Sequence, residues 1–522
     1  MTGATSVHSC WSMILPTLML VGLLAGCASL PSLEERESSE ALSIQQAQET
    51  RLGQSLAARL AAHPGLAGIY PLPDAREAFA TRVLLADMAD ETLDVQYYIW
   101  RADTTGLILL ASLMEAADRG VRVRLLLDDM NTSGMDPILR AADAHPNLDV
   151  RLFNPFVYRS ARWYGFLTDF SRLNRRMHNK SFTADNMISV IGGRNVGDEY
   201  FGATEDVAFS DLDVMVAGDV VREVSVDFDR YWASESAYPA ASILGEADET
   251  DLDEWSQAIE AVWKTERART YVKAILASDF VHQTQTRTLP VEWAKTRMFS
   301  DAPGKGLGQV AEDGLLSTQL SESIGEIHDQ FNLVSPYFIP TDTGVAALNR
   351  MESLGVEVRV LTNSLSATDV ALVHSGYARY RKALLEGGVE LYEMKALPGH
   401  GAMAESISNF GASATSLHAK TFEVDGTWLF VGSFNFDPRS THLNTELGFL
   451  IQSPSLAAKL ETLFDETVPR VAYRVQLDED GDLYWIDGEG EDAERWDVEP
   501  ETGWFKRFNV GFFSLLPIEG ML

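Results

Sequence analysis

The sequence predicts an α/β protein made of two tandem sandwich repeats that are related by pseudo-twofold symmetry, with the active site between them. Three observations support this prediction: a motif occurs twice, the two copies keep a constant offset, and short apolar strands alternate with helical patterns. An alternation of strand, helix and strand predicts a parallel-rich sheet with helices on both faces.

The repeated motif is a histidine, a lysine two residues later and an aspartate five residues after the lysine. A glycine follows seven residues after the aspartate, and an asparagine three residues after the glycine. A pattern with three fixed residues arises by accident on the order of once in ten thousand positions, so two matched copies indicate a functional site. The first copy contributes His178, Lys180, Asp185 and Asn195, and the second contributes His418, Lys420, Asp425 and Asn435.

The offset between the copies is nearly constant. It is 240 residues for the motif histidines, for the asparagines, and for the strands expected at 93–100 and 333–340. It is 235 residues for the strands expected at 121–126 and 356–361, so a five-residue difference opens in the first crossover and closes before the motif. Insertions of this kind fall in the loops and helix ends of two copies of one fold.

The elements of the first repeat follow from its apolar periodicity. The motif is expected on a hairpin, after which Gly192 and Gly193 let the backbone approach a ligand closely. The expected helices are 75–90, 105–119 and 137–144, the expected strands are 93–100, 121–127 and 149–152, and the hairpin strands are 181–182 and 187–191.

A chain of 522 residues is too long for one hydrophobic core, so several domains are expected. We divide it into a lipoprotein signal peptide at 1–26, a tether and amphipathic helix at 27–63, the first repeat at 64–240, an acidic connection at 241–285, the second repeat at 286–475 and a C-terminal extension at 476–522.

Composition excludes some functions. The net charge of −34 argues against a protein that grips nucleic acid, because such proteins carry a basic surface. The only cysteines are Cys10 and Cys27, so the body of the chain has no disulfide, no cysteine-based zinc site and no thiol nucleophile.

The N-terminal 26 residues contain no charged side chain, and their apolar run at 13–25 is too short for a comfortable membrane span. The run ends at residues 24–29, Leu-Ala-Gly-Cys-Ala-Ser, which resemble a bacterial lipobox with lipidation at Cys27. Ala28 is not aspartate, which in such lipoproteins indicates the outer membrane. We therefore expect a lipid-anchored protein on the periplasmic side of the outer membrane. An ordinary secretory signal and a buried helix are the alternatives.

Residues 153–177 interleave aromatic side chains with five arginines: Arg159, Arg162, Arg172, Arg175 and Arg176. One interpretation is a positive lip that holds anionic headgroups while its aromatic residues sit at a membrane interface. The other is a solvated loop with a few core aromatics. The tail at 504–516 is apolar with two cations, and it either packs on the core or dips into lipid.

Two copies of histidine, lysine and asparagine suit transfer at a phosphodiester. The nonbridging oxygens can be bound by Lys180, Lys420, Asn195 and Asn435. Because the two lysines neutralise the charge of the phosphate, no metal and no cofactor is required. One imidazole can attack phosphorus while the other protonates the leaving oxygen, and the second then activates an incoming alcohol or water.

An imidazole in this role needs a carboxylate on its other ring nitrogen. Asp211 and Glu446 follow their motif histidines by 33 and 28 residues, each just before an apolar strand, and we assign them this role. Asp185 and Asp425 belong to the motif sets, and we expect them to support the loop rather than take part in the chemistry.

The two motifs, with Gly-Gly-Arg-Asn at 192–195 and Gly-Ser-Phe-Asn at 432–435, resemble the phospholipase D superfamily over about residues 70–475. Residues 192–201, 434–440 and 516–519 are similar to its bacterial cardiolipin synthase branch, most of all the C-type. The resemblance implies His178 as nucleophile and His418 as general acid, an assignment that the symmetry of the sequence leaves open. It also implies a phosphatidyl-histidine intermediate that phosphatidylglycerol attacks to give cardiolipin, with phosphatidylethanolamine a candidate donor.

The leading hypothesis is a phosphatidyltransferase that acts as a monomer on phospholipids at a membrane surface and does not bind nucleic acid. A phospholipase D that uses water and yields phosphatidic acid has the same motifs. A nuclease of the same superfamily is disfavoured by the net charge, the doubled repeat and the lipid anchor. A non-catalytic envelope lipoprotein is disfavoured by the two intact motif sets.

Overall fold

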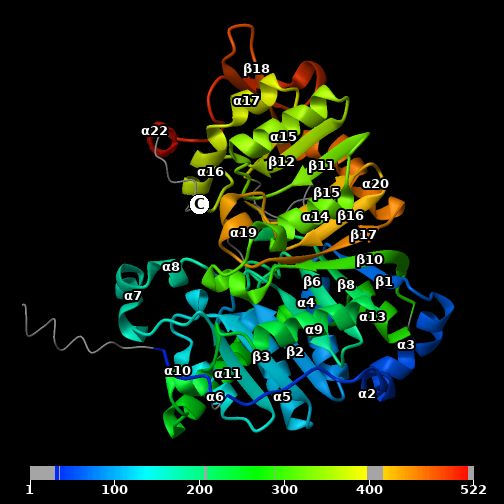
Figure 1. Cartoon of the computed structure of the whole chain (residues 1–522), viewed down its shortest axis with the longest axis vertical. Helices are drawn as coiled ribbons and strands as arrows, with labels where there is room; N and C mark the ends of the chain where they lie inside the picture. The colour runs from blue at the N-terminus through cyan, green and yellow to red at the C-terminus, as the bar shows by residue number, and fades with distance from the viewer. Residues whose placement is uncertain (1–29, 35, 205–207, 287, 397–415, 515–522) are drawn as a thin grey trace, which may run out of the picture.

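The computed structural model describes residues 30–34, 36–204, 208–286, 288–396 and 416–514 of the 522-residue chain. The expected signal peptide, the lipidation site Cys27 and the closing stretch 516–519 therefore lie outside the described residues. Within the described part, the chain forms the two expected α/β repeats, the first in the lower and the second in the upper half of Figure 1.

A single sheet runs through both repeats. It is continuous because β1 of the first repeat pairs antiparallel with β10 of the second, with Ala67 opposite Ala294. The strands on either side of this junction correspond one to one, which is the expected pseudo-twofold symmetry. In spatial order they are β9 (Ala237–Pro239), β4 (Leu148–Phe153), β3 (Arg122–Asp128), β2 (Thr92–Tyr97), β5 (Ser181–Ala184), β6 (Ile188–Gly192), β8 (Asp213–Ala217) and β1 (Ala67–Leu72), then β10 (Glu292–Ser300), β17 (Leu447–Gln452), β16 (Trp428–Gly432), β15 (Thr421–Val424), β11 (Gln330–Val334), β12 (Glu357–Asn363), β13 (Glu390–Met394) and β18 (Ala472–Leu477).

The sheet is mixed rather than parallel-rich. Parallel pairing is confined to β2, β3 and β4 in the first repeat and to β11, β12 and β13 in the second. These are the βαβ units that the sequence predicts. The remaining strands come from hairpins and returning segments, which join neighbours antiparallel.

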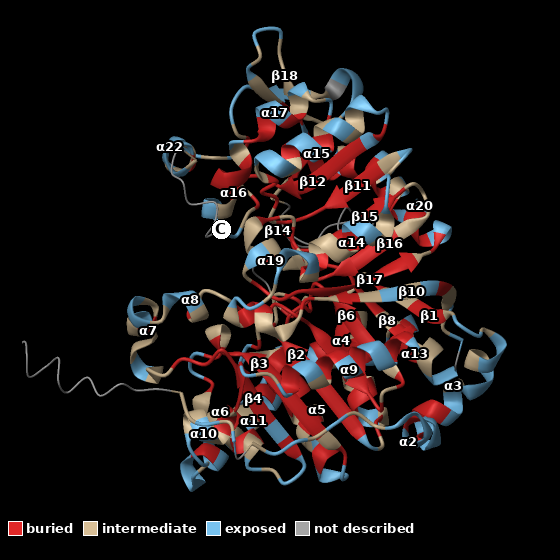
Figure 2. Ribbon diagram, in the orientation of Figure 1, coloured by how far each residue is buried: buried red, intermediate tan, exposed pale blue. Residues whose placement is uncertain are grey.

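Helices cover both faces of the sheet, as expected, and most of the strands are buried between them (Figure 2). Aspartates start two helices of the first repeat: Asp74 accepts from the amides of Arg76 and Glu77, and Asp103 accepts from that of Gly106. The helices are α4 (Ala75–Met88), α5 (Thr104–Asp118), α6 (Asp136–Asp143) and α9 (Val220–Trp232) in the first repeat, and α14 (Leu316–Ile324), α15 (Thr341–Ser353), α16 (Ala371–Ala378), α17 (Arg381–Glu386), α20 (Pro454–Thr462) and α21 (Val468–Val471) in the second.

One hydrophobic core belongs to both repeats. It joins α9 and β8 of the first repeat to β17 and α20 of the second, through buried residues such as Val221, Val214, Phe449 and Leu456. Since apolar burial stabilises by roughly 25 cal/mol per Å², this shared core opposes separation of the repeats and fixes the geometry of whatever lies between them.

The flanking segments are mostly helical. The single amphipathic helix expected at about 44–62 is interrupted at Thr50, whose extended backbone ends α2 (Ile44–Glu49) and whose side chain caps α3 (Arg51–Ala62). The acidic segment 241–285 contains α11 (Glu249–Lys264), α12 (Glu266–Leu276) and α13 (Asp279–Thr286). Their buried side chains join the core of the first repeat, while most of the acids of α11 are exposed.

The C-terminal segment adds to the second repeat. Strand β18 forms a hairpin with β19 (Leu483–Asp487), which pairs with β20 (Glu494–Trp496), and α22 (Trp504–Phe513) packs beside α16. Among the described residues, no helix has both the length and the apolar character to cross a membrane.

Candidate active site

The two motif histidines are brought together by short strands exchanged between the repeats. Strand β14 (Ser416–Leu417), just before His418, pairs parallel with β7 (Phe209–Ser210) of the first repeat. In the same way Met177, just before His178, bridges Thr445 of the second repeat. The amide of His178 donates to the carbonyl of Thr445 at 2.9 Å, and that of His418 donates to the carbonyl of Ser210 at 2.7 Å.

Each histidine is held by a carboxylate of the other repeat. His178 Nδ1 lies 2.8 Å from Glu446 Oε2, and His418 Nδ1 lies 2.6 Å from Asp211 Oδ2. Asp211 and Glu446 directly follow the residues that make the exchanged backbone bonds, so the strand pairing itself aims them at the opposite histidine. In both cases Nδ1 is occupied and Nε2 is left for chemistry.

The motif lysines are buried beside their own histidines. Lys180 Nζ donates to the carbonyl of His178 at 2.6 Å, and Lys420 Nζ donates to the carbonyl of His418. Burial lowers the pKa of Lys420 to about 8, and it lowers the pKa of Lys180 well below its ordinary value. An anion in the site would favour the charged form of both amines.

The motif asparagines and aspartates take two different places. Asn195 lines the same pocket as the histidines, and its Oδ1 accepts from the amide of Ile99 at 3.1 Å. Asn435 is buried, and its backbone N–H donates to Ser440 Oγ at 3.3 Å. The motif aspartates lie at the far end of their hairpins from the histidines. Asp185 accepts from the backbone amides of residues 90–92, and Asp425 from those of residues 328–330.

A pocket of about 340 Å³ opens onto both histidines. Tyr98 meets the ring of His178 edge-on at 4.9 Å between centroids, and Tyr200 meets that of His418 at 5.3 Å. Tyr337 donates to Asp369 at 2.8 Å across the same opening. The lining residues are Tyr98, Ile99, Arg101, His178, Asn195, Glu199, Tyr200, Phe209, Tyr337, Asp369 and His418.

Sequence reasoning missed the three tyrosines and Asp369. Tyr98 comes directly after β2, and Tyr337 stands three residues after the corresponding β11. Polar aromatic residues at the carboxyl ends of parallel strands are a usable signal, because ligands bind at that edge of α/β sheets.

The two carboxyl groups differ in pKa. Burial raises the pKa of Glu446 to about 7, against the opposing effects of Lys180 and the Ser433 hydroxyl. Burial would also raise the pKa of Asp211, but the adjacent His418 and Lys420 outweigh it, and the pKa lies below its ordinary value.

The two histidines differ in the same sense. Burial and the charges of Lys180 and Lys420 lower the pKa of His178 well below its ordinary value. Burial and Lys420 also lower the pKa of His418, but Asp211 opposes them. His178 therefore sits in the half-site that favours a neutral ring, and His418 in the one that retains a counter-charge for a proton.

The arginines of 153–177 do not form a free positive surface, so that expectation is wrong. The reason is that carboxylates and carbonyls of the same repeat and of the neighbouring one engage them. Arg159 pairs with Asp129 and Asp136, Arg162 donates to the carbonyl of Asp129, Arg172 pairs with Asp169, Arg175 donates to the carbonyl of His442, and Arg176 is buried against Asp128. The large apolar side chains that the segment exposes are Trp163, Leu167 and Phe170, on α7 (Arg162–Thr168) and α8 (Phe170–Leu173).

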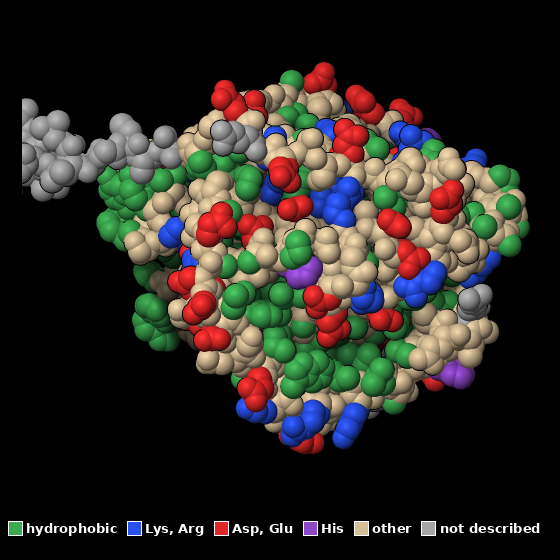
Figure 3. Space-filling model, turned by 90° about the horizontal axis from the view of Figure 1, so that it is seen from below, with side chains coloured by type: hydrophobic (Ala, Val, Ile, Leu, Met, Phe, Trp, Pro, Cys, Tyr) green, Lys and Arg blue, Asp and Glu red, His purple; other side chains and the backbone are tan. Residues whose placement is uncertain are grey.

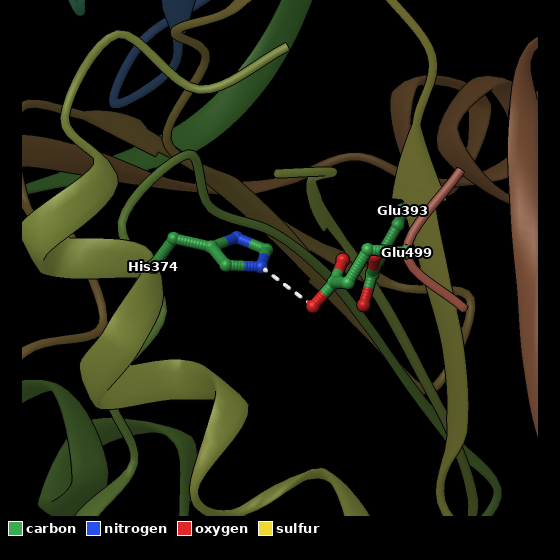
Figure 4. A group of neighbouring side chains, drawn as sticks. All are labelled: His374, Glu393 and Glu499. Atoms are coloured by element: carbon green, nitrogen blue, oxygen red, sulfur yellow. Dashed lines mark ion pairs between the residues drawn. The ribbon is translucent and has the colours of Figure 1, made fainter. Parts of the chain in front are cut away.

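Among the described residues, one group of three side chains has donor atoms close enough to hold a metal ion: His374, Glu393 and Glu499 (Figure 4). Arg381 already supplies the positive charge there, with its guanidinium 2.9 Å from Glu393 and 2.6 Å from Glu499. The group is better described as a buried ion cluster that ties the segment before α22 to α16, α17 and β13.

The comparisons with known proteins agree with this geometry. The family model described as "Cardiolipin synthase, PLD-like domain" matches residues 84–232 and 320–468. The chain therefore belongs to the phospholipase D superfamily, in its cardiolipin synthase branch. Cardiolipin synthase C of Escherichia coli (strain K12) is 47% identical over 90% of this chain and 100% of its own.

More distant relatives share most of the chain. An uncharacterized protein of Helicobacter pylori (strain ATCC 700392 / 26695) is 31% identical over 79% of this chain and 81% of its own. The crystal structure of a phosphatidylserine synthase from Haemophilus influenzae Rd KW20 superposes with a TM-score of 0.56, covering 90% of this chain and 99% of its own. At 13% identity that likeness shows the shared fold.

Proposed function

We propose that this protein is a phosphatidyltransferase that makes cardiolipin from phosphatidylglycerol and a second phospholipid, for which phosphatidylethanolamine is a candidate. The observation that carries the proposal is the pair of histidines, each held by a carboxylate of the opposite repeat and both facing one pocket. The similarity to a cardiolipin synthase, over 90% of this chain and 100% of the relative, supports the choice of substrates.

In the first step His178 Nε2 attacks the phosphorus of the donor lipid. A phosphorus–nitrogen bond forms, the bond from phosphorus to the headgroup oxygen breaks, and His418 gives its proton to that oxygen. The product is a phosphatidyl-histidine on His178. Its Nδ1 proton stays hydrogen-bonded to Glu446, which spreads the positive charge of the substituted ring.

In the second step the glycerol hydroxyl of phosphatidylglycerol gives its proton to His418, and its oxygen attacks the phosphorus. The phosphorus–nitrogen bond breaks, and His178 is restored. Lys180 and Lys420 neutralise the nonbridging oxygens in both steps, with Asn195 and Asn435 as amide donors. The negative charge of the bound phosphodiester also favours the proton that His418 needs at the start.

The proposal includes a lipid anchor on Cys27, after removal of residues 1–26, and a monomer at the periplasmic side of the outer membrane. The lipobox-like sequence and the absence of aspartate at Ala28 support it. The six segments defined from the sequence remain the proposed domain organisation.

The test is a product assay on mixed vesicles of phosphatidylglycerol and phosphatidylethanolamine. We expect cardiolipin from the parent and none from His178→Ala or His418→Ala. Phosphatidic acid as the only product would move the protein to the phospholipase D alternative. A folded parent that turns over neither lipid would contradict both, and would favour the nuclease or the non-catalytic lipoprotein.

A further inference from the structure

Exposed aromatic side chains are concentrated on three helices. Among the described residues, eight tryptophan and phenylalanine side chains are exposed, and seven of them lie on α7, α8 or α22. Trp163 is 68% exposed and Trp504 is 72% exposed, where a packed core would bury them. The seven are Trp163, Phe170, Trp504, Phe505, Phe508, Phe512 and Phe513, and Leu167 on α7 is exposed beside them.

These helices lie on one side of the molecule, although more than three hundred residues separate α8 from α22 in the sequence. Figure 1 shows α7, α8, α16 and α22 along the left side, and Figure 3 shows hydrophobic side chains gathered at the left edge of the view from below. Two segments that are distant in sequence thus build one exposed apolar surface. A large exposed apolar surface on a folded protein marks an interaction site.

The same side carries the mouth of the active site. Helices α7 and α8 follow the carboxyl end of β4, and α16 follows that of β12. At this edge Asp128, the last residue of β3, accepts from the amide of Met177, next to His178. Asp369, two residues before α16, lines the pocket.

The charge of these helices differs from that of the chain. In a protein with a net charge of −34, α22 has Lys506 and Arg507 and no acid. Between the first residue of α7 and the last of α8 the only acid is Asp169, which is paired with Arg172, and the Arg162 guanidinium lies 3.5 Å from the carboxylate of Asp129. Tryptophan and phenylalanine together with cations that have no acid on the same helix, as on α22, are typical of segments that sit at the interface of an anionic bilayer.

We propose that the exposed faces of α7, α8 and α22, together with Val370 and Leu372 at the start of α16, form a surface that docks into the lipid bilayer around the mouth of the active site. The ion cluster of Arg381 and Glu499 fixes the segment before α22, so α22 is held as part of a rigid rim rather than as a loose tail. The choice of a bilayer over a second copy of the chain rests on the proposed function, whose substrates are bilayer lipids.

The first experiment reads the surface locally, because a lipid anchor would mask simple binding. The full chain with Cys10→Ser and Cys27→Ser has no other cysteine. One cysteine is then introduced by Leu167→Cys, by Phe508→Cys or by Leu354→Cys, and it is labelled with an environment-sensitive fluorophore. Leu354 is a matched control, because it is 69% exposed against 74% for Leu167 and lies at the opposite end of β12 from α16.

With vesicles of phosphatidylglycerol and phosphatidylethanolamine, we expect the labels at 167 and 508 to shift to the blue and to be quenched by lipids with brominated acyl chains. The label at 354 should stay as in water. Equal behaviour of all three labels would overturn the proposal. A blue shift in buffer alone that grows with protein concentration would assign the face to a second copy of the chain, and would overturn it too.

A second experiment separates docking from chemistry. We expect Leu167→Asn with Phe508→Asn to lower turnover on vesicles at least about tenfold, while turnover of lipid dispersed in detergent micelles stays within about twofold. Leu354→Asn should change neither. Equal losses on vesicles and micelles would overturn the docking surface. A parent without turnover on either substrate would overturn the proposed function, and the labels would still decide the docking surface.

Discussion

The two halves of the active site are built from the same kinds of side chains but differ in the pKa of the carboxyl group that each histidine faces. His178 faces Glu446, whose pKa is raised to about 7, and His418 faces Asp211, whose pKa is lowered. The difference arises outside the repeated motif, in the partner that each histidine receives. A duplicated motif therefore predicts where the chemistry occurs, while the surrounding residues determine which histidine acts as nucleophile and which as acid.

The residues behind the carboxylates explain part of this difference. A side chain at Gly193 would place its Cβ 2.1 Å from Asp211 Oδ1, so only glycine lets Asp211 lie where it does. The equivalent residue in the second repeat is Ser433, whose hydroxyl donates to the longer Glu446. Gly193 with Asp211 and Ser433 with Glu446 are thus two equivalent combinations, and each places a carboxyl group on the Nδ1 atom of a catalytic histidine.

The largest expected effect separates nucleophile from acid. His178→Ala and His418→Ala should each reduce cardiolipin formation by at least about 10³-fold, since the histidines act as a unit. With a donor that has a p-nitrophenyl leaving group, which departs without a proton, His418→Ala should recover release of p-nitrophenol and His178→Ala should not. His282→Ala, on the exposed side of α13, is the matched control. Recovery by His178→Ala alone would reverse the roles.

A smaller effect is expected at the two carboxylates. Asp211→Asn removes a charge at every working pH, and we expect a loss in kcat/KM on the order of 10²–10³-fold that is constant from pH 5 to 9. Glu446→Gln should cost about tenfold or less below pH 7, where Glu446 is largely protonated, and more above it as the parent ionises. Parallel pH profiles for the two variants would contradict the charge difference between the half-sites.

The next largest effects on activity are expected at Gly193 and Ser433, the residues that contact the two carboxyl groups. Gly193→Ala forces Asp211 away from His418, and a loss of about 10- to 100-fold is expected from a displacement of about 1 Å. Ser433→Ala removes the hydrogen bond to Glu446, for which a loss of about 2- to 10-fold is expected. Steady-state kinetics on micellar lipid would measure both. A larger loss for Ser433→Ala would show that the two combinations are not equivalent.

The smallest effect concerns stability. Glu446 binds a proton more tightly in the folded state, so its contribution to the free energy of unfolding falls as pH rises from about 4.5 to about 7. The fall is at most about 3 kcal/mol, by the value of a pKa unit. Urea unfolding at several pH values should show a shallower decline for Glu446→Gln. Asp211→Asn should leave this window unchanged, because the stabilisation from a lowered pKa is lost only on further acidification.

Much of this architecture could be predicted from the sequence. The offset of 240 residues identified two copies of one fold, and periodicity placed β2, β3 and α5 within a few residues of their observed bounds. The proportion of parallel strands could not be predicted, because pairing partners depend on how hairpins return to the sheet rather than on any local pattern.

The site was harder to predict than the fold. The sequence identifies Asp211 and Glu446 as orienting carboxylates but not the histidine that each one serves, and strand exchange gives each to the histidine of the other repeat. Counting arginines in 153–177 likewise could not reveal Asp128 or Asp129, which lie upstream and come close only when the sheet forms. Both limits have one cause: tertiary packing determines which residues that are distant in sequence become partners.

The exchange also sets when the protein can first act. His178 and Glu446 are 268 residues apart in the chain, and His418 and Asp211 are 207 apart. During synthesis from the N-terminus, the first histidine is made long before its carboxylate, and the second repeat must fold before either pair exists. A chain that ends before the second repeat thus has no complete catalytic centre. Folding of the second repeat completes both histidine–carboxylate pairs together.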